Sequence, residues 1–243
     1  MRYGIISDVH GNLEALHVVL EHLRQQSVDR YVFLGDAVGY GPNPNEVCDL
    51  IRPLAMVSIV GNHDAAVAGR MDYSQYYDAA RLALDWCSQR LSPQNLSWLK
   101  GLPYKVREGE VEFSHGSPVA PELFDYLFGV EQVMELMDAA DELAPVTFIG
   151  HSHLTLSFCI KDGAVTPIVA PAITCDPHAK YIITVGSVGQ PRDRDPRTCC
   201  GVFDTRSRIF EYHRLDYDVQ TTRKKILDAG LAPVFGERLL VGI

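Results

Sequence analysis

The sequence predicts an α/β protein in which helices cover sheets of buried strands. Residues 31–34 read Tyr-Val-Phe-Leu, and Gly35 and Asp36 follow them directly. A short apolar run bounded by turn residues is typical of a strand buried on both faces, and such strands occur in sheets covered by helices. Ligands of these sheets bind outside the carboxyl ends of the strands. Asp36 is therefore the first candidate for a functional residue.

The segment between the first two apolar runs predicts a helix over residues 12–25. Asn12 suits the N-cap position, because its side chain can accept a hydrogen bond from the first turn. Leucines then recur three or four residues apart, as the buried face of a helix requires, at Leu13, Leu16, Leu20 and Leu23. The chain therefore begins with a strand, a turn and a helix.

The next region predicts three more helices around a third strand. Pro93 follows Ser92 and Gly101 comes nine residues after Ser92, which is the usual arrangement of proline near the start of a helix and glycine at its end. The elements expected in order are a helix through Val47 and Ile51 that Pro53 ends, a strand at residues 56–60, a loop beyond Asp64, a helix through Ala79, Leu82, Leu84 and Trp86, and a helix from Ser92 to Gly101.

The second half of the chain predicts short strands that form a sheet of their own, packed against the first. A hairpin around Glu108-Gly109 and a helix at residues 130–140 precede them. Residues 166–180 contain three prolines and are expected to form a loop. The strands are expected at residues 146–149, 156–161, 165–168, 181–184, 200–204 and 208–213, followed by a helix at residues 219–229 that Gly230 ends and a short helix in the tail.

Length and composition indicate one folded domain over residues 1–243. The chain is 47% hydrophobic and 22% charged, which is ordinary for a globular protein. Its formal net charge of -9 argues against stable binding to nucleic acid or to an anionic membrane, since both depend on clustered Lys and Arg. A small phosphorylated substrate would therefore need local positive charge. Composition does not indicate an oligomeric state.

The six cysteines show neither Cys-x-x-Cys spacing nor a disulfide framework, so free thiols in a reducing compartment are expected. The first residues open directly onto a strand, without the charged and apolar regions of a signal peptide. No apolar run approaches the length that a bilayer crossing needs. We therefore expect a cytoplasmic protein.

Five predicted strands end in residues that bind metals. One polar residue after a strand means little, because turns favour Asp and Asn, any single His is more often structural, and Asp8 alone could cap a helix. Five such endings are harder to explain in that way. Two neighbouring divalent ions need a bridging group and several nitrogen and oxygen ligands, and Asp36 is a natural bridge. The full candidate set is Asp8, His10, Asp36, Asn62, His63, Asp64, His115, His151 and His153.

This pattern resembles the calcineurin-like metallophosphoesterases. Residues 186–192, Gly-Ser-Val-Gly-Gln-Pro-Arg, also match a run in the small bacterial phosphoesterase branch, so the resemblance covers residues 1–196. The family motifs Asp-x-His, Gly-Asp, Gly-Asn-His-Asp/Glu, a lone His and Gly-His-x-His occur here in order as Asp8-Val-His10, Gly35-Asp36, Gly61-Asn-His-Asp64, His115 and Gly150-His-Ser-His153.

The resemblance implies a four-layer sandwich of two mixed sheets flanked by helices, and a dinuclear metal site for phosphoester hydrolysis. The two divalent ions would be manganese, iron, zinc, nickel or magnesium. A hydroxide bridging them would be the nucleophile, His63 the general acid, and Asp64 the residue that orients His63. Carried over residue by residue, it gives Asp8, His10 and His153 to one metal, Asn62, His115 and His151 to the other, and Asp36 to both.

Three alternatives stay open beside a phosphodiesterase. A retromer subunit resembles this fold without the full catalytic set, so a non-catalytic interaction module is one. The others are a protein phosphatase or another phosphomonoesterase, and a dinucleoside polyphosphate hydrolase. In the protein phosphatase branch the Gly-Asp motif continues to an Asp-Arg-Gly and an arginine precedes Gly-Asn-His, whereas here Ala-Val-Gly-Tyr follows Asp36 and Val60 precedes Gly61. Arginine forks suit the dianion of a monoester, so their absence favours diesters.

The remaining basic residues favour structural roles. Arg192 and Arg194 alternate with Asp193 and Asp195, which is typical of a solvated loop paired within itself. His178 lies in the irregular Asp176-Pro-His segment and is expected to be an ordinary loop residue. Each of these side chains, and Arg70, could still fold over the site and contact substrate.

Overall fold

Apolar side chains on the central strands alternate between two buried layers. On β1 (Arg2–Ile6), Ile5 packs between the sheets and Ile6 packs beneath the helices. On β2 (Arg30–Phe33), Val32 and Phe33 divide in the same way. Because successive side chains of a strand point to opposite faces, a strand that is apolar throughout is buried on both sides. The prediction of strands buried on both faces is confirmed.

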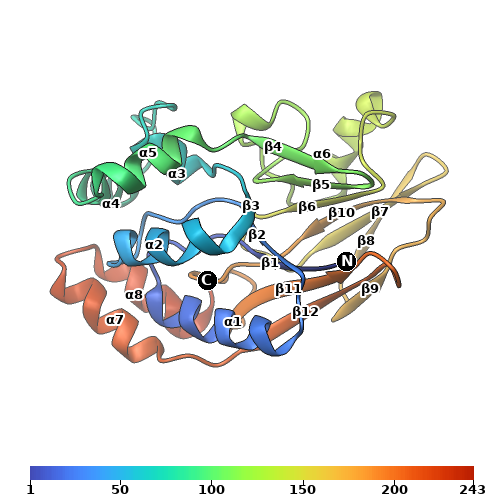
Figure 1. Ribbon diagram of the computed structural model, residues 1–243. Coiled ribbons are helices and arrows are strands. Elements are labelled where there is room, and N and C mark those ends of the chain that lie inside the picture. The colour runs from blue at the N-terminus through green and yellow to red at the C-terminus, as the bar shows by residue number, and fades with distance from the viewer.

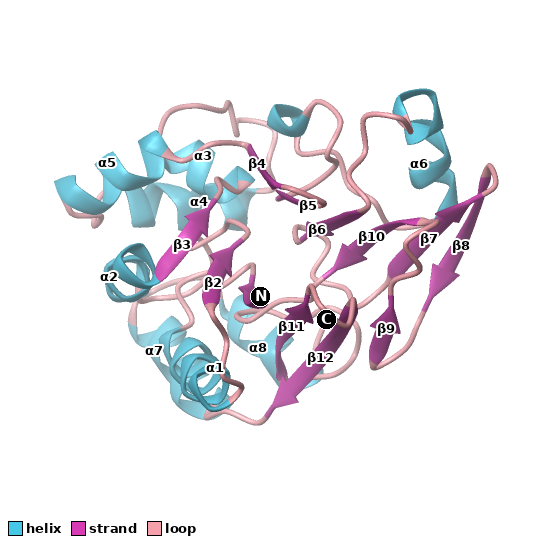
Figure 2. Cartoon of the chain, turned by 45° about the vertical axis from the view of Figure 1, so that its right-hand side comes forward, coloured by secondary structure: helices cyan, strands magenta, loops and turns pink.

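The computed structural model describes residues 1–243 and contains two six-stranded mixed sheets with helices on their outer sides (Figure 1). Figure 2 separates the strands of the two sheets. The expected α/β sandwich is confirmed. The first sheet has the order β3 (Ala55–Ser58), β2, β1, β11 (Thr198–Asp204), β12 (Ile209–Leu215) and β9 (Ala172–Thr174); the second has the order β4 (Lys105–Glu108), β5 (Val111–Ser114), β6 (Val146–Ile149), β10 (Lys180–Thr184), β7 (Ser157–Lys161) and β8 (Ala164–Ile168).

The helices begin where the capping residues predict. The Asn12 side chain accepts a hydrogen bond from the Ala15 N–H at 3.1 Å, and Ser92 accepts one from the Asn95 N–H at 3.2 Å. The helices are α1 (Leu13–Gln25), α2 (Pro44–Leu54), α3 (Asn62–Val67), α4 (Asp78–Ser88), α5 (Pro93–Gly101), α6 (Val130–Met134), α7 (Val219–Asp228) and α8 (Pro233–Val241), with 3-10 turns at Pro121–Leu123 and Glu135–Ala139.

The expectation that the second half forms its own sheet is wrong. Strands β11 and β12 extend the first sheet, because β11 runs antiparallel to β1, while the β4–β5 hairpin joins the second sheet beside β6. Gly201 lies opposite Ile5, and a side chain at position 201 would collide with the ring of Phe210. Sheet membership depends on such long-range packing, which local periodicity does not encode.

Three local expectations also need correction. The predicted loop after Asp64 begins with α3, a short helix whose side chains are all buried and which tertiary packing therefore stabilises. Helix α2 continues through Pro53 to Leu54, since a proline in the last turn leaves little helix to break. The predicted loop at residues 166–180 contains β9, an edge strand that pairs with β12.

The parallel strands of both sheets end at one edge of the molecule. Strands β1, β2 and β3 are parallel in the first sheet, and β5, β6 and β10 are parallel in the second. The Val188 N–H, after β10, donates to the Ser7 carbonyl, after β1, at 3.0 Å. The loops that follow the two sets of strands are therefore joined. None of the helices has the length and apolar content that a bilayer crossing requires.

Candidate metal centre

All the residues that the sequence singled out lie at this joined edge, and all are buried. They follow β1, β2, β3, β5 and β6, so both sheets contribute to a single cluster. Burying this many ionisable groups together costs free energy unless they are paired or bind an ion. The residues are Asp8, His10, Asp36, Asn62, His63, Asp64, His115, His151 and His153.

Five of these residues adopt the left-handed backbone conformation, which non-glycine residues seldom take. Their φ angles lie between 47° and 66°, and the residues are Asp8, His10, Asp36, His151 and His153. Such a conformation costs of order 1 kcal/mol or more per residue, and it tends to cluster at functional sites. In each case it forms the sharp turn that brings a side chain from a strand end back toward the cluster.

The loops that carry these turns are fastened to one another through their backbones. The Asp8 N–H donates to the Gly35 carbonyl at 3.0 Å, and the Gly150 N–H donates to the His115 carbonyl at 2.8 Å. Gly150 itself lies so close to Asp8 that any side chain there would collide with it. The glycines of the sequence motifs thus allow the close approach of neighbouring loops.

Three histidines are held in one tautomer by backbone carbonyls. Nδ1 of His10 lies 2.9 Å from the Val38 oxygen, Nδ1 of His115 lies 2.7 Å from the Leu34 oxygen, and Nδ1 of His153 lies 2.6 Å from the Gln190 oxygen. A carbonyl only accepts, so each Nδ1 must carry the proton. In a neutral ring, each Nε2 then presents a lone pair, as metal-binding histidines do.

The freed Nε2 atoms face one another and the carboxylates. Nε2 of His10 lies 3.2 Å from Nε2 of His153, although neither atom has a proton to donate when its ring is neutral. Nε2 of His153 lies 3.4 Å from Asp8, and Nε2 of His115 lies 3.3 Å from Asp36. Lone pairs and carboxylates that converge in this way need a cation between them. The donor set therefore fits divalent metal ions.

Ligand atoms within 4.8 Å of one another form three overlapping groups, each able to hold an ion. Asp36 belongs to two of them. Asn62 extends the group that contains His115, because its side-chain oxygen lies 3.2 Å from Nε2 of His115. The groups are Asp8 with His10 and His153, Asp36 with His115 and His151, and His10 with Asp36 and His63.

Burial and mutual charge displace the pKa values of the two central carboxyls in opposite directions. Burial raises the pKa of Asp8 to about 7, and the neighbouring charge of Asp36 adds to that rise. Burial alone would raise the pKa of Asp36 as well, but the adjacent charge of His115 holds it well below its usual range. Burial would lower the pKa of His115, yet Asp36 raises it to about 9. Without a bound ion, Asp36 and His115 therefore stabilise each other's charged forms, whereas the charged form of Asp8 is disfavoured.

His63 occupies the wall of the cluster. Burial lowers the pKa of its imidazole to about 4. Nδ1 is buried against Gly39 without a hydrogen-bond partner, so Nε2 is the ring nitrogen open to the outside. The ring packs at 4.8 Å from the His10 ring and at 4.6 Å from the Tyr40 ring.

The structure corrects the expected contact between Asp64 and His63. The Asp64 carboxylate accepts hydrogen bonds from the backbone N–H groups of Asp36 at 2.7 Å and Ala37 at 2.9 Å. It also accepts one from Gly61 at 3.3 Å, so it joins the loops after β2 and β3. Asp64 therefore positions the Asp36 loop, because its oxygens point to that backbone and not to the imidazole.

Arg192 lies at this cluster, which corrects its interpretation as part of a loop paired within itself. Its guanidinium donates to the Gln190 side-chain oxygen at 2.9 Å and lies 5.7 Å from the centre of the Tyr40 ring. Its positive charge adds to the effect of burial in lowering the pKa of His153. The sequence favoured a structural role for Arg192 and left a place over the site open for it. The run from Gly186 to Arg192, which matches the small bacterial phosphoesterase branch, was the signal for that second interpretation.

The other basic side chains that were left open lie elsewhere. Arg70 donates to the Leu102 carbonyl at 2.6 Å and stacks on the ring of Tyr104. Arg194 is exposed and reaches no carboxylate within 4 Å. His178 is exposed in the turn before β10, whereas the cluster lies beyond the far end of that strand.

Comparison with known proteins agrees with this geometry. The sequence profile of the calcineurin-like phosphoesterases matches residues 1–184. The chain belongs to this family. The resemblance noted in the motifs is therefore confirmed, and the protein is a metallophosphoesterase, an enzyme that hydrolyses phosphoric ester bonds.

Relatives of this phosphoesterase occur in bacteria and archaea. The uncharacterized protein MJ0912 of Methanocaldococcus jannaschii is 37% identical over 98% of the chain and 97% of its own length. A crystal structure of a metallophosphoesterase from Sphaerobacter thermophilus is 35% identical, covers 100% of this chain and 99% of its own, and has a TM-score of 0.85. A symmetrical bis(5'-nucleosyl)-tetraphosphatase from Methylococcus capsulatus is 34% identical over 47% of the chain and 43% of its own length.

A cavity of about 490 Å³ opens beside the cluster of the phosphoesterase. Asn62, His63 and His151 form its floor, so a molecule in the cavity would touch the candidate ligands directly. The Tyr126 ring stacks on the His151 ring at 3.6 Å between centres, and the Tyr76 hydroxyl accepts a hydrogen bond from Asn62 at 2.7 Å. The sequence gave no reason to select these tyrosines, because they lie in loops without a motif.

Proposed function

We propose that this metallophosphoesterase is a two-metal phosphodiesterase that acts on a small substrate. The observation that carries the proposal is the pair of Nε2 lone pairs on His10 and His153, 3.2 Å apart, beside two buried carboxylates. A metal cation between such groups would relieve their repulsion while both rings stay neutral. The buried cluster and the cavity next to it support one site where metal and substrate meet.

The residues present fit two divalent ions, which the family requires. Bound metals would supply a hydroxide near neutral pH and offset negative charge on the phosphoryl oxygens. Asp36 is the residue proposed to bind both ions, since its Oδ2 lies 3.6 Å from Nε2 of His10 and 3.3 Å from Nε2 of His115, which are candidate ligands of different ions. The remaining ligands would be Asp8, His10 and His153 for one ion, and Asn62, His115 and His151 for the other.

His63 is proposed as the general acid. Its Nε2 faces the cavity, so a proton on that atom can pass to the departing oxygen. The imidazole is neutral in the protein alone, since its pKa is about 4, and an anionic substrate beside it would favour the protonated form. Asp64 contributes indirectly, by holding the Asp36 loop through backbone hydrogen bonds.

The small number of arginines near the cluster supports a preference for diesters over monoesters. Residues 37–40, Ala-Val-Gly-Tyr, stand where the protein phosphatase branch continues to its Asp-Arg-Gly, and Val60 stands where that branch has an arginine before Gly-Asn-His, so neither place supplies an arginine for a monoester dianion. Arg192 is the one arginine whose side chain reaches the cluster. A diester carries one negative charge less than a monoester, so it depends less on additional cations.

Hydrolysis of a dinucleoside polyphosphate is a second candidate. The relative from Methylococcus capsulatus is named a bis(5'-nucleosyl)-tetraphosphatase, and it shares 34% identity over 47% of this chain. In a dinucleoside polyphosphate, as in a phosphodiester, each phosphorus atom carries substituents on two of its oxygens. Both candidates therefore predict a site that accepts phosphorus with a substituent on each side.

Comparison of three substrates tests the proposal. The purified protein, loaded with Mn²⁺, is expected to hydrolyse bis-p-nitrophenyl phosphate at least as efficiently as p-nitrophenyl phosphate, and to lose both activities on chelation. Diadenosine tetraphosphate in a third reaction separates the two candidates by kcat/KM. A metal-loaded protein that is inert toward all three would contradict the proposal and favour the interaction module.

A further inference from the structure

The segment from Gly186 to Arg192 forms hydrogen bonds with the loops that carry Asp8 and His153. The Ser187 hydroxyl donates to the Asp8 carbonyl at 2.9 Å, and the Gly189 N–H donates to the same oxygen at 2.8 Å. The Gln190 carbonyl fixes the tautomer of His153, as described above. The Arg192 N–H donates to the His153 carbonyl at 3.2 Å. The base of the Arg192 side chain is therefore fixed to the loop that carries a candidate ligand.

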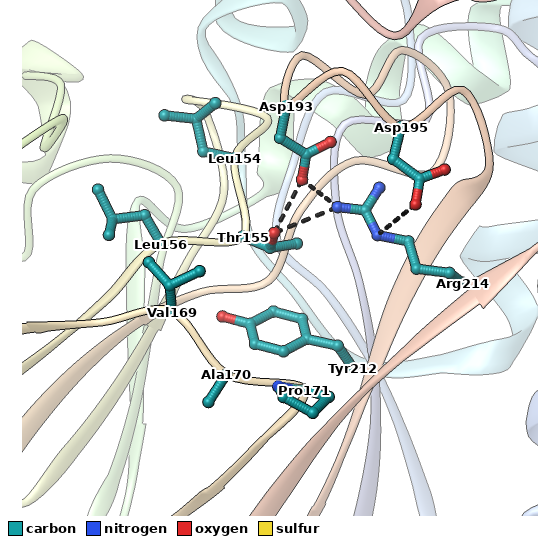
Figure 3. A pocket seen from close by; sticks show the side chains of 10 residues that line it. All are labelled: Leu154, Thr155, Leu156, Val169, Ala170, Pro171, Asp193, Asp195, Tyr212 and Arg214. Carbon is teal, nitrogen blue, oxygen red and sulfur yellow. Dashed lines mark hydrogen bonds and ion pairs between the residues drawn. The ribbon is translucent and has the colours of Figure 1, made fainter.

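The Arg192 guanidinium is positioned without a carboxylate partner. Both of its contacts go to the same oxygen of Gln190, at 2.9 and 3.3 Å, and Gln190 is buried. The two acidic neighbours turn to the other side of the loop, where Asp193 pairs with Arg214 and Asp195 pairs with Arg197 and Arg214. Figure 3 shows both carboxylates directed at the Arg214 guanidinium.

The guanidinium lies near two tyrosines that contact the cluster. Tyr40 packs against the rings of His10 and His63, and Tyr126 stacks on His151. Tyr40 and Tyr126 line the same cavity beside the cluster, and Arg192 is a hydrogen-bonding neighbour of both hydroxyls. Arg192 thus places a positive charge at the cavity next to the cluster.

Packing on Tyr40 alone does not account for this arrangement. The guanidinium carbon lies 5.7 Å from the ring centre, close to the limit of about 6 Å for a cation–π contact. Two of its five N–H donors share the Gln190 side-chain oxygen, and the hydroxyls of Tyr40 and Tyr126 are its other neighbours, so all of its partners are neutral. A planar guanidinium without an anionic partner beside a metal cluster matches the oxygens of a phosphoryl group.

We propose that Arg192 binds the non-bridging oxygens of the substrate phosphoryl group, held in place by Gln190. The inference rests on the proposed function, because it places the phosphoryl group at the same cluster. The contact gains strength with the charge of the phosphoryl group, so it favours the dianion of a monoester more than the monoanion of a diester. Arg192 therefore sets how far monoesters are accepted beside diesters.

Three variants of one loop test the proposal. Arg192→Gln removes the charge and the fork, Arg192→Lys keeps the charge alone, and Arg194→Gln removes an equal charge from the exposed neighbour. For each Mn²⁺-loaded protein, kcat/KM is measured with p-nitrophenyl phosphate and bis-p-nitrophenyl phosphate. Binding of inorganic phosphate is measured by calorimetry, and metal content by mass spectrometry.

Arg192→Gln is expected to lower kcat/KM for the monoester and the affinity for phosphate by about 10- to 100-fold, the usual effect of a lost charged hydrogen bond. The diester is expected to lose several-fold less, so the ratio of diester to monoester activity rises. Arg192→Lys should recover part of the loss. Arg194→Gln should match the wild type, and both metals should remain in all variants.

An equal loss on both esters with unchanged phosphate binding would overturn the proposal, because a purely structural role predicts that result. Wild-type values in Arg192→Gln would overturn it as well. Failure of the proposed function gives a different result, since a wild type that hydrolyses neither ester leaves the phosphate titration as an independent measure of the Arg192 contact. A matching loss of phosphate affinity in Arg192→Gln would support the proposal even then.

Discussion

The loop from Gln190 to Asp195 separates two regions with similar side chains but opposite pairing. On one side, Arg214 meets both Asp193 and Asp195, beside a cavity of about 520 Å³ (Figure 3). The Arg214 guanidinium also donates a hydrogen bond to the Thr155 hydroxyl at 3.2 Å. The charged groups on this side are therefore paired with one another. On the other side, the metal cluster keeps histidine lone pairs, two central carboxylates and a guanidinium close together without enough partners.

The difference separates structural polar groups from functional ones. A buried polar group without a partner costs about 1 to 3 kcal/mol, and strained backbone adds to that cost. The Arg214 region bears less of both costs, with one unpartnered oxygen on Asp193 and one left-handed residue, Arg194, whereas the cluster has five left-handed residues and facing Nε2 atoms. The free energy of metal and substrate binding can offset such costs only at the cluster. Removal of metal should therefore affect the two regions differently.

The largest effect is expected from Asp36→Asn, because the Asp36 carboxylate lies next to candidate ligands of both proposed ions, His10 and His115. We expect loss of most bound metal and a fall in kcat/KM of about 1,000-fold or more, the scale of removing an essential electrostatic contact. Mass spectrometry of the purified protein gives the metal content. Asp176→Asn is the matched control, since Asp176 pairs with Lys161 far from the cluster. Near-normal occupancy of two metals in Asp36→Asn would remove Asp36 from the bridging role.

His63→Ala tests the cluster residue that is proposed as the general acid and not as a ligand. We expect both metals to remain and kcat to fall by about 100-fold or more, the usual contribution of a general acid. The loss should be smaller for leaving groups that need little protonation, such as p-nitrophenol, than for alkyl alcohols. A series of aryl and alkyl esters measures this dependence. An equal loss across the series would argue against proton donation by His63.

Local sequence patterns predicted the candidate site better than they predicted the sheets. Each strand-end motif names its ligand within a few residues, so Asp36 or His115 can be found without knowing which strands pair. Sheet membership depends on contacts such as Ile5 with Gly201, which are nearly 200 residues apart. Most strands could be predicted because each apolar run is a local pattern. The pairing between strands could not be predicted, because it depends on residues far apart in the chain.

The roles of single polar side chains were harder to predict, because they depend on which way a loop turns. Asp64 and Arg192 both stand beside motif residues in the sequence. The Asp64 carboxylate accepts hydrogen bonds from backbone N–H groups. The Arg192 side chain lies at the cluster, whereas Asp193 turns away from it to pair with Arg214. Alternating charges predicted pairing within the loop, but Arg214 comes from a distant strand and takes the acids instead. A partner so far along the chain leaves no local signal.

Chelation of the metals should destabilise the fold by a moderate amount. A ligand present at 100 times its Kd stabilises the native state by about 2.7 kcal/mol, and 1 kcal/mol shifts Tm by about 2 to 4 °C in a protein of this size. We expect the chelated protein to melt about 5 to 10 °C below the metal-loaded one in calorimetry. Asp36→Asn should lose most of this difference. Equal Tm values with and without chelator would mean that the cluster does not bind metal strongly.

Arg214→Gln should have the smallest effect and one confined to stability. The Arg214 and Asp193 side chains are each 15% exposed, so removing the cation leaves largely buried carboxylates without their main partner. Breaking such a pair costs about 1 to 3 kcal/mol, less than for a fully buried pair because solvent still reaches both groups. We expect a fall in Tm of several degrees with unchanged metal content and phosphate affinity. A drop in phosphate affinity together with the fall in Tm would show that Asp193, once released, competes for Arg192, and that the two sides of the loop are coupled through that choice of partner.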